Sequence, residues 1–358
     1  MKKICFLLLI LIIPYKVFAL SAASAIVIDQ DSKRVLYSKN AYEPKLIAST
    51  TKIMTALVAI ENSDINKTIK VDDSVLKAYG SAIYIEIGEK LTIKDLLYGL
   101  MLRSGNDAAL VIANNVCKNE KEFVKLMNQK ALELGMKNTI FFNPHGLEED
   151  DGNGNTSTAY DMAILMANAM NNKEFANITK TKSYTVKTNK KTYVWKNKNK
   201  LLNTYQYTTG GKTGFTKKAR RTLVSSASKD HKKLIVVTLN DPNDFNNHKN
   251  LYEEYFKKYD LVKIIDHKKY KIKNKIFKKN LIIKNDIKVL LTKKEKKNIK
   301  ININLNKQQK FSNNNQVGYL SITLNNKEIA KENIYLEKEK KNIKQKKNIF
   351  SKIKSWFS

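Results

Sequence analysis

Ser49 and Lys52 could form a nucleophile and its base. They open an apolar segment, 46–60, in which the spacing of the apolar residues predicts a helix. Because residues three apart share one face of a helix, the Lys52 amine should reach the Ser49 hydroxyl. A serine hydroxyl is a poor nucleophile without a base. A lysine supplies that base only if its pKa falls from about 10.4 towards neutrality.

Three effects would lower the pKa of Lys52 in such a site. Burial disfavours the charged ammonium. The positive end of the helix dipole, at the start of the helix, also disfavours it. Lys212 would add like-charge repulsion if the fold brings it close. The sequence therefore predicts a buried Lys52 with a second lysine beside it.

Two further motifs follow along the chain. Ser104 and Asn106 belong to a Ser-Gly-Asn sequence between helices predicted at 96–102 and 108–116. Ser104 would relay a proton to a leaving amine, and Asn106 would bind the amide of a substrate. A Lys-Thr-Gly sequence occupies 212–214, on a predicted strand.

The Lys-Thr-Gly motif is expected to bind the substrate. Lys212 and Thr213 would hold a terminal carboxylate, with Gly214 completing the motif. The backbone N–H groups of Ser49 and Phe215 would form an oxyanion hole. Each motif alone also has an ordinary explanation, because Ser49 and Asn106 could cap helices and Lys212 could be a surface charge. The ordered occurrence of all three favours a catalytic site.

The elements around these motifs predict an α/β (α+β) domain over 20–260. A hairpin is expected at 25–37, helices follow, and strands return at 184–187 and 193–196. Three strands, at 211–216, 222–227 and 234–239, then form an antiparallel meander. Strands at both ends with helices between them imply an antiparallel sheet closed by both termini, with a helical insertion.

The composition changes near residue 260. Runs with a period of two at 270–273, 287–290 and 299–303, with a hairpin over 317–335, predict a small β-rich domain at 262–336. The whole chain has 358 residues, of which 42% are hydrophobic, so disorder throughout is excluded. Its two cysteines exclude a disulfide scaffold and a cysteine-based zinc ribbon.

The ends of the chain predict export and membrane attachment. Residues 1–19 have a charged start, an apolar run and a cleavage site after Ala19, as in a signal peptide. At 338–358 a lysine-rich tether leads into a helix with Ile, Phe and Trp on one face, which is typical of a helix lying in a membrane interface. Docking of that helix on its own domain is the alternative. We expect the protein on the outer face of the cytoplasmic membrane, either periplasmic or extracellular.

The charge is strongly positive and uneven. The formal charge is +33, and residues 261–358 contribute 27 lysines against 7 acidic residues. Such a balance suggests nucleic acid, acidic lipid or an anionic wall polymer as a partner, or simply a solvated surface. The export signal argues against nucleic acid.

The three motifs resemble the Ser-x-x-Lys, Ser-Asp-Asn and Lys-Thr-Gly set of β-lactamases and penicillin-binding proteins, with Gly105 in place of the aspartate. The likeness is most detailed to low-molecular-mass penicillin-binding proteins that are serine-type D-alanyl-D-alanine carboxypeptidases. It extends through the segments 48–56, 104–109, 143–147, 157–163 and 212–216.

This resemblance implies a β-lactamase/transpeptidase-like fold and removal of the terminal D-alanine from the peptidoglycan stem pentapeptide through an acyl-Ser49 intermediate. It also implies covalent inhibition by β-lactam antibiotics, with no cofactor and no metal. Two departures stand out. Arg220 and Arg221 follow Ala219 where the family often has glycine, and Asn155 replaces a histidine that is common in the family.

Two alternative functions remain open. A β-lactamase would need a glutamate that positions water, and Glu149 with Asn153 has a loosely suitable spacing. A non-catalytic protein that binds wall or membrane could keep the same fold. His145 is expected to be structural, and a role for His248 stays open.

Overall fold

The computed structural model describes residues 20–149, 152–306 and 316–337. They divide into two compact units between Lys258 and Tyr259. The predicted signal peptide, 1–19, and the predicted tether and anchor helix, 338–358, lie outside the described residues. No helix in the described part is long and apolar enough to cross a membrane.

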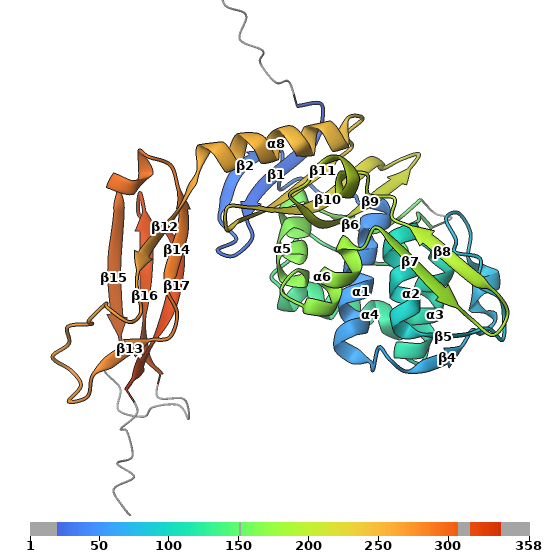
Figure 1. Cartoon of the computed structure of the whole chain (residues 1–358), viewed down its shortest axis with the longest axis horizontal. Helices are drawn as coiled ribbons and strands as arrows, with labels where there is room; N and C mark the ends of the chain where they lie inside the picture. Colours follow the sequence, from blue (N-terminus) through green and yellow to red (C-terminus); the bar gives the residue numbers. More distant parts are fainter. Residues whose placement is uncertain (1–19, 150–151, 307–315, 338–358) are drawn as a thin grey trace, which may run out of the picture. The chain divides into compact units, whose positions relative to one another are not determined.

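The first unit is built on a five-stranded antiparallel sheet (Figure 1). Its spatial order is β2-β1-β11-β10-β9, so the first two strands of the unit join its last three. The bounds are β1 Ser24–Asp29, β2 Val35–Lys39, β9 Thr208–Thr216, β10 Arg220–Lys229 and β11 Lys232–Leu239. This is the predicted sheet closed by both ends of the domain.

Helices cover both faces of this sheet. All six residues of β1 are buried, as expected for a strand that is covered on both sides. Helix α5 (Ala159–Ala169) packs on β1, β10 and β11, and helix α8 (Asp244–Lys258) packs on β10 and β11. The alternation of side chains along a strand sends Val224 to the main core, while Ser225 faces α8. Helix α8 was not among the helices predicted from the sequence.

The helical insertion surrounds helix α1. Its elements, in chain order, are the 3₁₀ turn η1 Ala48–Thr51, α1 Lys52–Asn62, the 3₁₀ turn η2 Asp73–Lys77, α2 Ile93–Tyr98, the π-helical turn η3 Gly99–Arg103, α3 Asn106–Val116, α4 Glu120–Glu133, α6 Lys173–Lys180 and α7 Leu201–Thr204. Helix α1 packs against α3, α4, α5 and α6, so its start lies deep in the molecule. Three two-stranded ribbons complete the unit: β3 Lys45–Leu46 with β6 Thr156–Ser157, β4 Thr68–Lys70 with β5 Lys90–Thr92, and β7 Ser183–Lys187 with β8 Thr192–Lys196.

Two predicted helices differ in detail. The segment 46–60 begins with the tighter 3₁₀ turn η1, and the α-helix starts only at Lys52. The segment 96–102 divides between α2 and η3, and α2 starts earlier because Thr92 and Asp95 form a capping box. The turn η3 ends at Ser104, whose backbone has a left-handed φ of 66°.

The second unit is all-β. One four-stranded antiparallel sheet has the order β13-β17-β16-β15, and β12 pairs with β14. The bounds are β12 Asp260–Ile265, β13 Leu281–Ile283, β14 Ile287–Leu291, β15 Ile299–Leu305, β16 Gln316–Leu324 and β17 Lys327–Leu336, with a 3₁₀ turn η4 at Glu295–Lys297. The strand predicted at 270–273 is wrong, because this segment runs as a loop whose Ile272 is buried. Alternation alone does not distinguish a strand from an extended loop that buries one side chain.

A tight loop supports the turn that carries Ser49. Gly146 has a φ of 88°, and a Cβ there would collide with the carbonyl oxygen of Ala48 and lie 2.7 Å from Thr51 Oγ1. Gly135 has a similar φ of 74°, but nothing lies within 4 Å of the place its Cβ would take. Glycine is therefore required at 146 for two reasons, the positive φ of the backbone and the lack of space for a Cβ.

We predict that Gly146→Ala lowers the free energy of unfolding by about 3 kcal/mol or more, from left-handed strain and overpacking together. Gly135→Ala should lose only the strain, about 1–2 kcal/mol. Urea denaturation of the two variants checks this. Equal losses would contradict the close packing of this loop on η1.

Candidate active site

Ser49 and Lys52 lie as the helical spacing predicts. Ser49 belongs to η1, and Lys52 is the first residue of α1. The Lys52 ammonium nitrogen, Nζ, is 3.1 Å from Ser49 Oγ. Lys52 has no exposed surface, whereas Ser49 lines a cavity. The pair therefore presents the hydroxyl to the outside and keeps the amine beneath it.

Two more acceptors hold Lys52. Its Nζ donates to Asn106 Oδ1 at 2.7 Å and to the carbonyl oxygen of His145 at 2.6 Å. Burial lowers the pKa of Lys52 well below its usual value, and the charges of Lys212 and Lys198 lower it further. Once neutral, the amine would still donate to both oxygens and direct its lone pair at Ser49 Oγ.

Ser104 and Lys212 form a second pair in the same site. Lys212 Nζ donates to Ser104 Oγ at 3.0 Å and to the carbonyl oxygen of Thr213 at 2.7 Å. Lys212 is 1% exposed. Burial, together with the charge of Lys198, lowers the pKa of Lys212 to about 7. Near neutral pH this lysine can therefore change its protonation state.

Strand β9 lies directly beside η1. A Cβ on Gly214 would collide with Thr222 Oγ1 and lie 3.0 Å from the backbone nitrogen of Ser49. The strand can approach the nucleophile this closely only because residue 214 has no side chain. The predicted oxyanion pair, the N–H groups of Ser49 and Phe215, thus comes from two adjacent segments.

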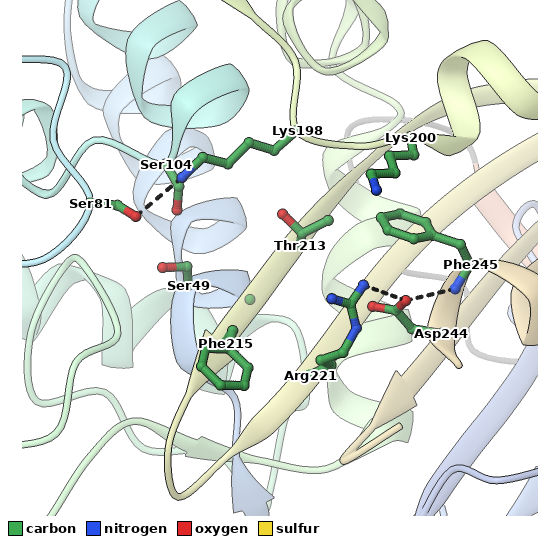
Figure 2. A pocket seen from close by; sticks show the side chains of 11 residues that line it. Ser49, Ser81, Ser104, Lys198, Lys200, Thr213, Phe215, Arg221, Asp244 and Phe245 are labelled. Atoms are coloured by element: carbon green, nitrogen blue, oxygen red, sulfur yellow. Dashed lines mark hydrogen bonds and ion pairs between the residues drawn. The ribbon is translucent and has the colours of Figure 1, made fainter. Parts of the chain in front are cut away.

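A cavity of about 370 Å³ opens over these groups (Figure 2). Of the predicted site residues, Ser49, Ser104, Thr213, Gly214 and Phe215 line it. The other three, Lys52, Asn106 and Lys212, are buried behind this lining. All predicted site residues therefore gather at one place, although they come from three distant parts of the chain.

Asn106 bonds both Lys52 and the loop that carries Tyr79. Its Oδ1 accepts from Lys52, and its Nδ2 donates to the carbonyl oxygen of Tyr79 at 2.5 Å. One Nδ2 hydrogen is left for a substrate amide. Next to it, the Asp107 carboxylate accepts from the backbone nitrogens of Ile83 and Tyr84. These bonds tie the loop before β5 to the start of α3.

Several lining residues were missed by sequence reasoning. Lys198 Nζ donates to Ser81 Oγ at 3.2 Å (Figure 2). Arg221 pairs with the buried Asp244, and Lys200 and Phe245 lie at the same end of the cavity. Arg221 had an indirect signal, because it directly follows Arg220, which stands where the family often has glycine. The others carry no local motif, and only the fold brings them here.

The two buried histidines, His145 and His248, make structural hydrogen bonds. The ring of His145 accepts from the backbone nitrogen of Leu147, and burial with the nearby Lys52 charge lowers its pKa to about 3. His248 lies between α8 and the sheet, where its ring nitrogens contact Ser225 Oγ and Thr238 Oγ1. Burial lowers the pKa of His248 to about 3. Both rings are therefore neutral near pH 7.

Hydrogen bonds also define the positions of Asn155 and Glu149. Asn155 bonds Thr51 Oγ1 and the backbone of 142–143, so it braces η1 from below. Glu149 Oε1 accepts from Asn143 Nδ2 at 2.6 Å, and Glu149 lines a separate cavity with residues of α3 and α4. The β-lactamase interpretation requires a glutamate that positions water at Ser49, and Glu149 is not placed to do this.

One group in the second unit has potential metal ligands. Asp266, His267 and Asp286 have ligand atoms within 4.8 Å of one another. Lys263 Nζ lies 3.0 Å from Asp286 Oδ2 and 3.5 Å from Asp266 Oδ2, so an ammonium already neutralises both carboxylates. Among the described residues this group stands apart from the serine–lysine site, which carries no metal-ligating cluster of its own.

The fold and the cavity define a class of protein: a serine hydrolase whose serine lies beside a buried lysine at the edge of an antiparallel sheet. Family models specify it further. Residues 14–243 match "D-alanyl-D-alanine carboxypeptidase" (Peptidase_S11), and residues 256–348 match "Penicillin-binding protein 5, C-terminal domain". The chain belongs to the D-alanyl-D-alanine carboxypeptidase family, as its motifs indicate.

Curated relatives agree with this family. The D-alanyl-D-alanine carboxypeptidase DacF of Bacillus subtilis is 41% identical over 223 residues, which is 60% of this chain and 56% of that protein. DacB2 of Mycobacterium tuberculosis is 35% identical over 61% of this chain and 74% of its own length. This chain thus matches little more than half of DacF.

Solved structures show the same fold. A D-alanyl-D-alanine carboxypeptidase of Mycobacterium tuberculosis H37Rv has a TM-score of 0.64 at 32% identity, over 67% of this chain and 92% of that one. Penicillin-binding protein 5 of Haemophilus influenzae has a TM-score of 0.73 at 25% identity, over 89% of this chain and 97% of that one. The predicted fold class is confirmed, including the additional all-β domain.

The two buried lysines should influence each other's titration. Because the charge of Lys212 lowers the pKa of Lys52, Lys212→Met should raise the pKa of Lys52. It should also remove a lysine signal that titrates at about pH 7. NMR of ¹³C-labelled lysine side chains across pH 5–11 measures both. An unchanged Lys52 titration in the variant would contradict the coupling.

Proposed function

We propose that the protein removes the C-terminal D-alanine from peptidoglycan stem pentapeptides through an acyl-Ser49 intermediate. The observation that carries this proposal is the pairing of Lys52 with Ser49 and of Lys212 with Ser104 around one cavity. The two pairs supply a nucleophile with its base and a second hydroxyl with its own proton source. The family of the chain and the names of its relatives support the same reaction.

In the acylation step, Ser49 Oγ attacks the carbonyl carbon of the scissile peptide bond, and its proton passes to the neutral amine of Lys52. The negative charge that develops on the carbonyl oxygen is received by the backbone N–H groups of Ser49 and Phe215. These donors are in place before substrate arrives, because the absence of a side chain at Gly214 lets β9 pack closely against η1. They therefore need little reorganisation during the reaction.

Ser104 completes the proton transfer. Its hydroxyl, bonded to Lys212, delivers a proton to the leaving amine of D-alanine as the C–N bond breaks, and is reprotonated through the adjacent amines. Water then attacks the acyl-Ser49 ester and releases the shortened peptide. The terminal carboxylate of the substrate is held by Lys212 from beneath and by Thr213 from the wall of the cavity. Asn106 orients Lys52 and offers its remaining Nδ2 hydrogen to the substrate amide.

The direct test combines mass spectrometry with labelled penicillin. Incubation of the protein with a pentapeptide should release one alanine, and labelled penicillin should give a persistent covalent adduct. Ser49→Ala should abolish both, by a factor of about 10⁴ or more in rate, because the nucleophile is lost. Ser81→Ala, which changes another serine of the same cavity, is the matched control and should still form the adduct.

Other outcomes identify the competing functions. Rapid turnover of penicillin without a lasting adduct would indicate a β-lactamase. A wild-type protein that neither cleaves the peptide nor forms an adduct would indicate a non-catalytic binding protein and would end the present proposal.

We further propose that the protein is exported and attached to the outer face of the cytoplasmic membrane through 338–358. The sequence supports this with its signal-like start, its lysine-rich tether and its amphipathic end. Each lysine near an anionic leaflet adds roughly 1 kcal/mol of attraction. The tethered helix would hold the catalytic unit near the wall.

Deletion of 338–358 should move the protein from the membrane to the soluble fraction while penicillin binding is kept. Cell fractionation and immunoblotting of the full-length and shortened chains measure this. A matched control keeps the length and charge of 338–358 but replaces Phe350, Trp356 and Phe357 by serine, and it should also be released. Membrane retention of the shortened chain would refute the anchor.

A further inference from the structure

An exposed apolar patch lies on the segment between η2 and β5. Its members are large side chains that remain mostly or partly in solvent: Leu76, Tyr79, Tyr84 and Ile87, which are 77%, 58%, 74% and 46% exposed. All four line one cavity of about 490 Å³. We call these four residues the tyrosine patch. Large apolar patches on a protein surface mark binding sites.

The backbone is strained where it presents Tyr84. This residue has a left-handed φ of 61°, which is rare for a bulky side chain. Two hydrogen bonds hold the conformation. The backbone nitrogen of Tyr84 donates to Asp107 Oδ2 at 2.8 Å, and its carbonyl oxygen accepts from Tyr193 Oη at 3.0 Å. Strained residues cluster at binding and catalytic sites, and here the strain holds an aromatic ring outside the core.

Ion pairs hold the other end of the tyrosine patch. The carboxylate of Glu86 lies 3.3 Å from Lys190 Nζ and 2.6 Å from Lys191 Nζ, in the turn between β7 and β8. The backbone nitrogen of Glu86 also donates to Glu89 Oε2 at 2.9 Å. The patch is therefore arranged before any ligand arrives, and a prearranged surface loses less conformational entropy on binding.

The tyrosine patch adjoins the active-site cavity. Gly80 and Ala82 line the cavity of the patch, whereas Ser81, between them, lines the cavity of Ser49. Figure 2 shows Ser81 beside Ser49 in the active-site cavity. One stretch of three residues thus separates the two cavities, so a long substrate can extend from one to the other.

A second connection runs to the strand that carries the Lys-Thr-Gly motif. Tyr79 Oη donates to the carbonyl oxygen of Glu148 at 3.1 Å. The carboxylate of Glu148 accepts from Thr216 Oγ1, at the end of β9. The patch is therefore continuous with the active site through Tyr79 as well as through Ser81.

The length of the substrate indicates what reaches the tyrosine patch. In a stem pentapeptide, four residues separate the scissile bond from the sugar that carries the peptide, and when extended they span about 13–14 Å. Tyr84 follows Ser81 by three residues and lies at most about 11 Å from it. A substrate that leaves the cavity past Ser81 therefore brings its sugar chain to the patch.

The mixed chemistry of the patch suits a carbohydrate. A pyranose ring has apolar C–H faces and a polar rim, and a tyrosine has an apolar ring and a polar hydroxyl. The cavity of the patch also has charged groups in its lining, those of Glu86, Asp107 and Lys190. A lipid chain would cover these groups without offering hydrogen bonds, which is unfavourable. Sugar hydroxyls and acetamido groups would offer them.

We propose that the tyrosine patch binds the glycan strand of peptidoglycan, with Tyr79 and Tyr84 stacked on sugar rings. This inference rests on the proposed function and deepens it, because it names the substrate as a stem peptide that is still attached to its glycan. The patch holds the polymer while the stem peptide passes Ser81 to reach Ser49. The enzyme then selects wall-bound peptides over free ones.

Isothermal titration calorimetry with peptide-free glycan strands tests the patch directly. Strands released from peptidoglycan by an amidase carry no stem peptide, so their binding does not depend on the catalytic groups. High salt screens general attraction to the lysine-rich chain. Tyr84→Asn and Leu76→Ser should each weaken glycan binding by about 5- to 10-fold, because each removes apolar contact area. Asparagine adopts a left-handed backbone more readily than tyrosine, so Tyr84→Asn should fold.

Tyr42→Asn and Leu132→Ser are the matched controls. Tyr42 is 56% exposed and Leu132 is 78% exposed, and neither lines the cavity of the patch. Both variants should bind the glycan as tightly as the unchanged protein. Circular dichroism of every variant verifies folding.

Three outcomes separate the possibilities. Glycan binding that is absent, or that the patch and control variants weaken equally, would overturn the inference. In sedimentation velocity, a dimer that Tyr84→Asn dissociates would assign the patch to a second copy of the chain and would also overturn it. Absence of pentapeptide hydrolysis with glycan binding intact would overturn only the proposed function.

Discussion

The site depends on keeping the amine of Lys52 away from water. A buried ammonium is costly by several kcal/mol, and the surrounding oxygens offset only part of that cost. The oxygens that accept from Lys52 Nζ are one hydroxyl, one amide and one backbone carbonyl, and none of these three is a carboxylate. Burial of the amine in this setting disfavours the ammonium and lowers the pKa of Lys52, and the charges of Lys212 and Lys198 lower it further.

Lys212 adds a second buried amine to the same site. Like charges in one low-dielectric region repel, so protonation of one lysine disfavours protonation of the other. Because burial and the charge of Lys198 lower the pKa of Lys212 to about 7, this lysine can change its protonation state near neutral pH. The rest of the fold must hold these two amines together, which explains why the helix α1 and the strand β9 are so deeply packed.

The fold supplies this packing by joining distant segments. The sheet pairs β1 with β11, which brings the start of the unit beside its end, and the helices fill the space below (Figure 1). The nucleophile is carried by η1, the second hydroxyl by the turn before α3, and the Lys-Thr-Gly motif by the edge strand β9. The β-rich second unit has its own core around Val289 and Ile322, so it is organised independently of the catalytic cavity.

The sequence by itself identified the catalytic groups, through the types and spacing of residues in three short motifs. The spacing of Ser49 and Lys52 places them on one face of a helix, and short apolar runs separated by turns predicted the strands of the main sheet. The tertiary structure decided what spacing does not encode. It turned Asn106 to Lys52, placed Glu149 in another cavity, made 270–273 a loop and brought Arg221 and Asp244 to the mouth of the site. Those outcomes depend on which distant segments pack together, and no local pattern of residues carries that information.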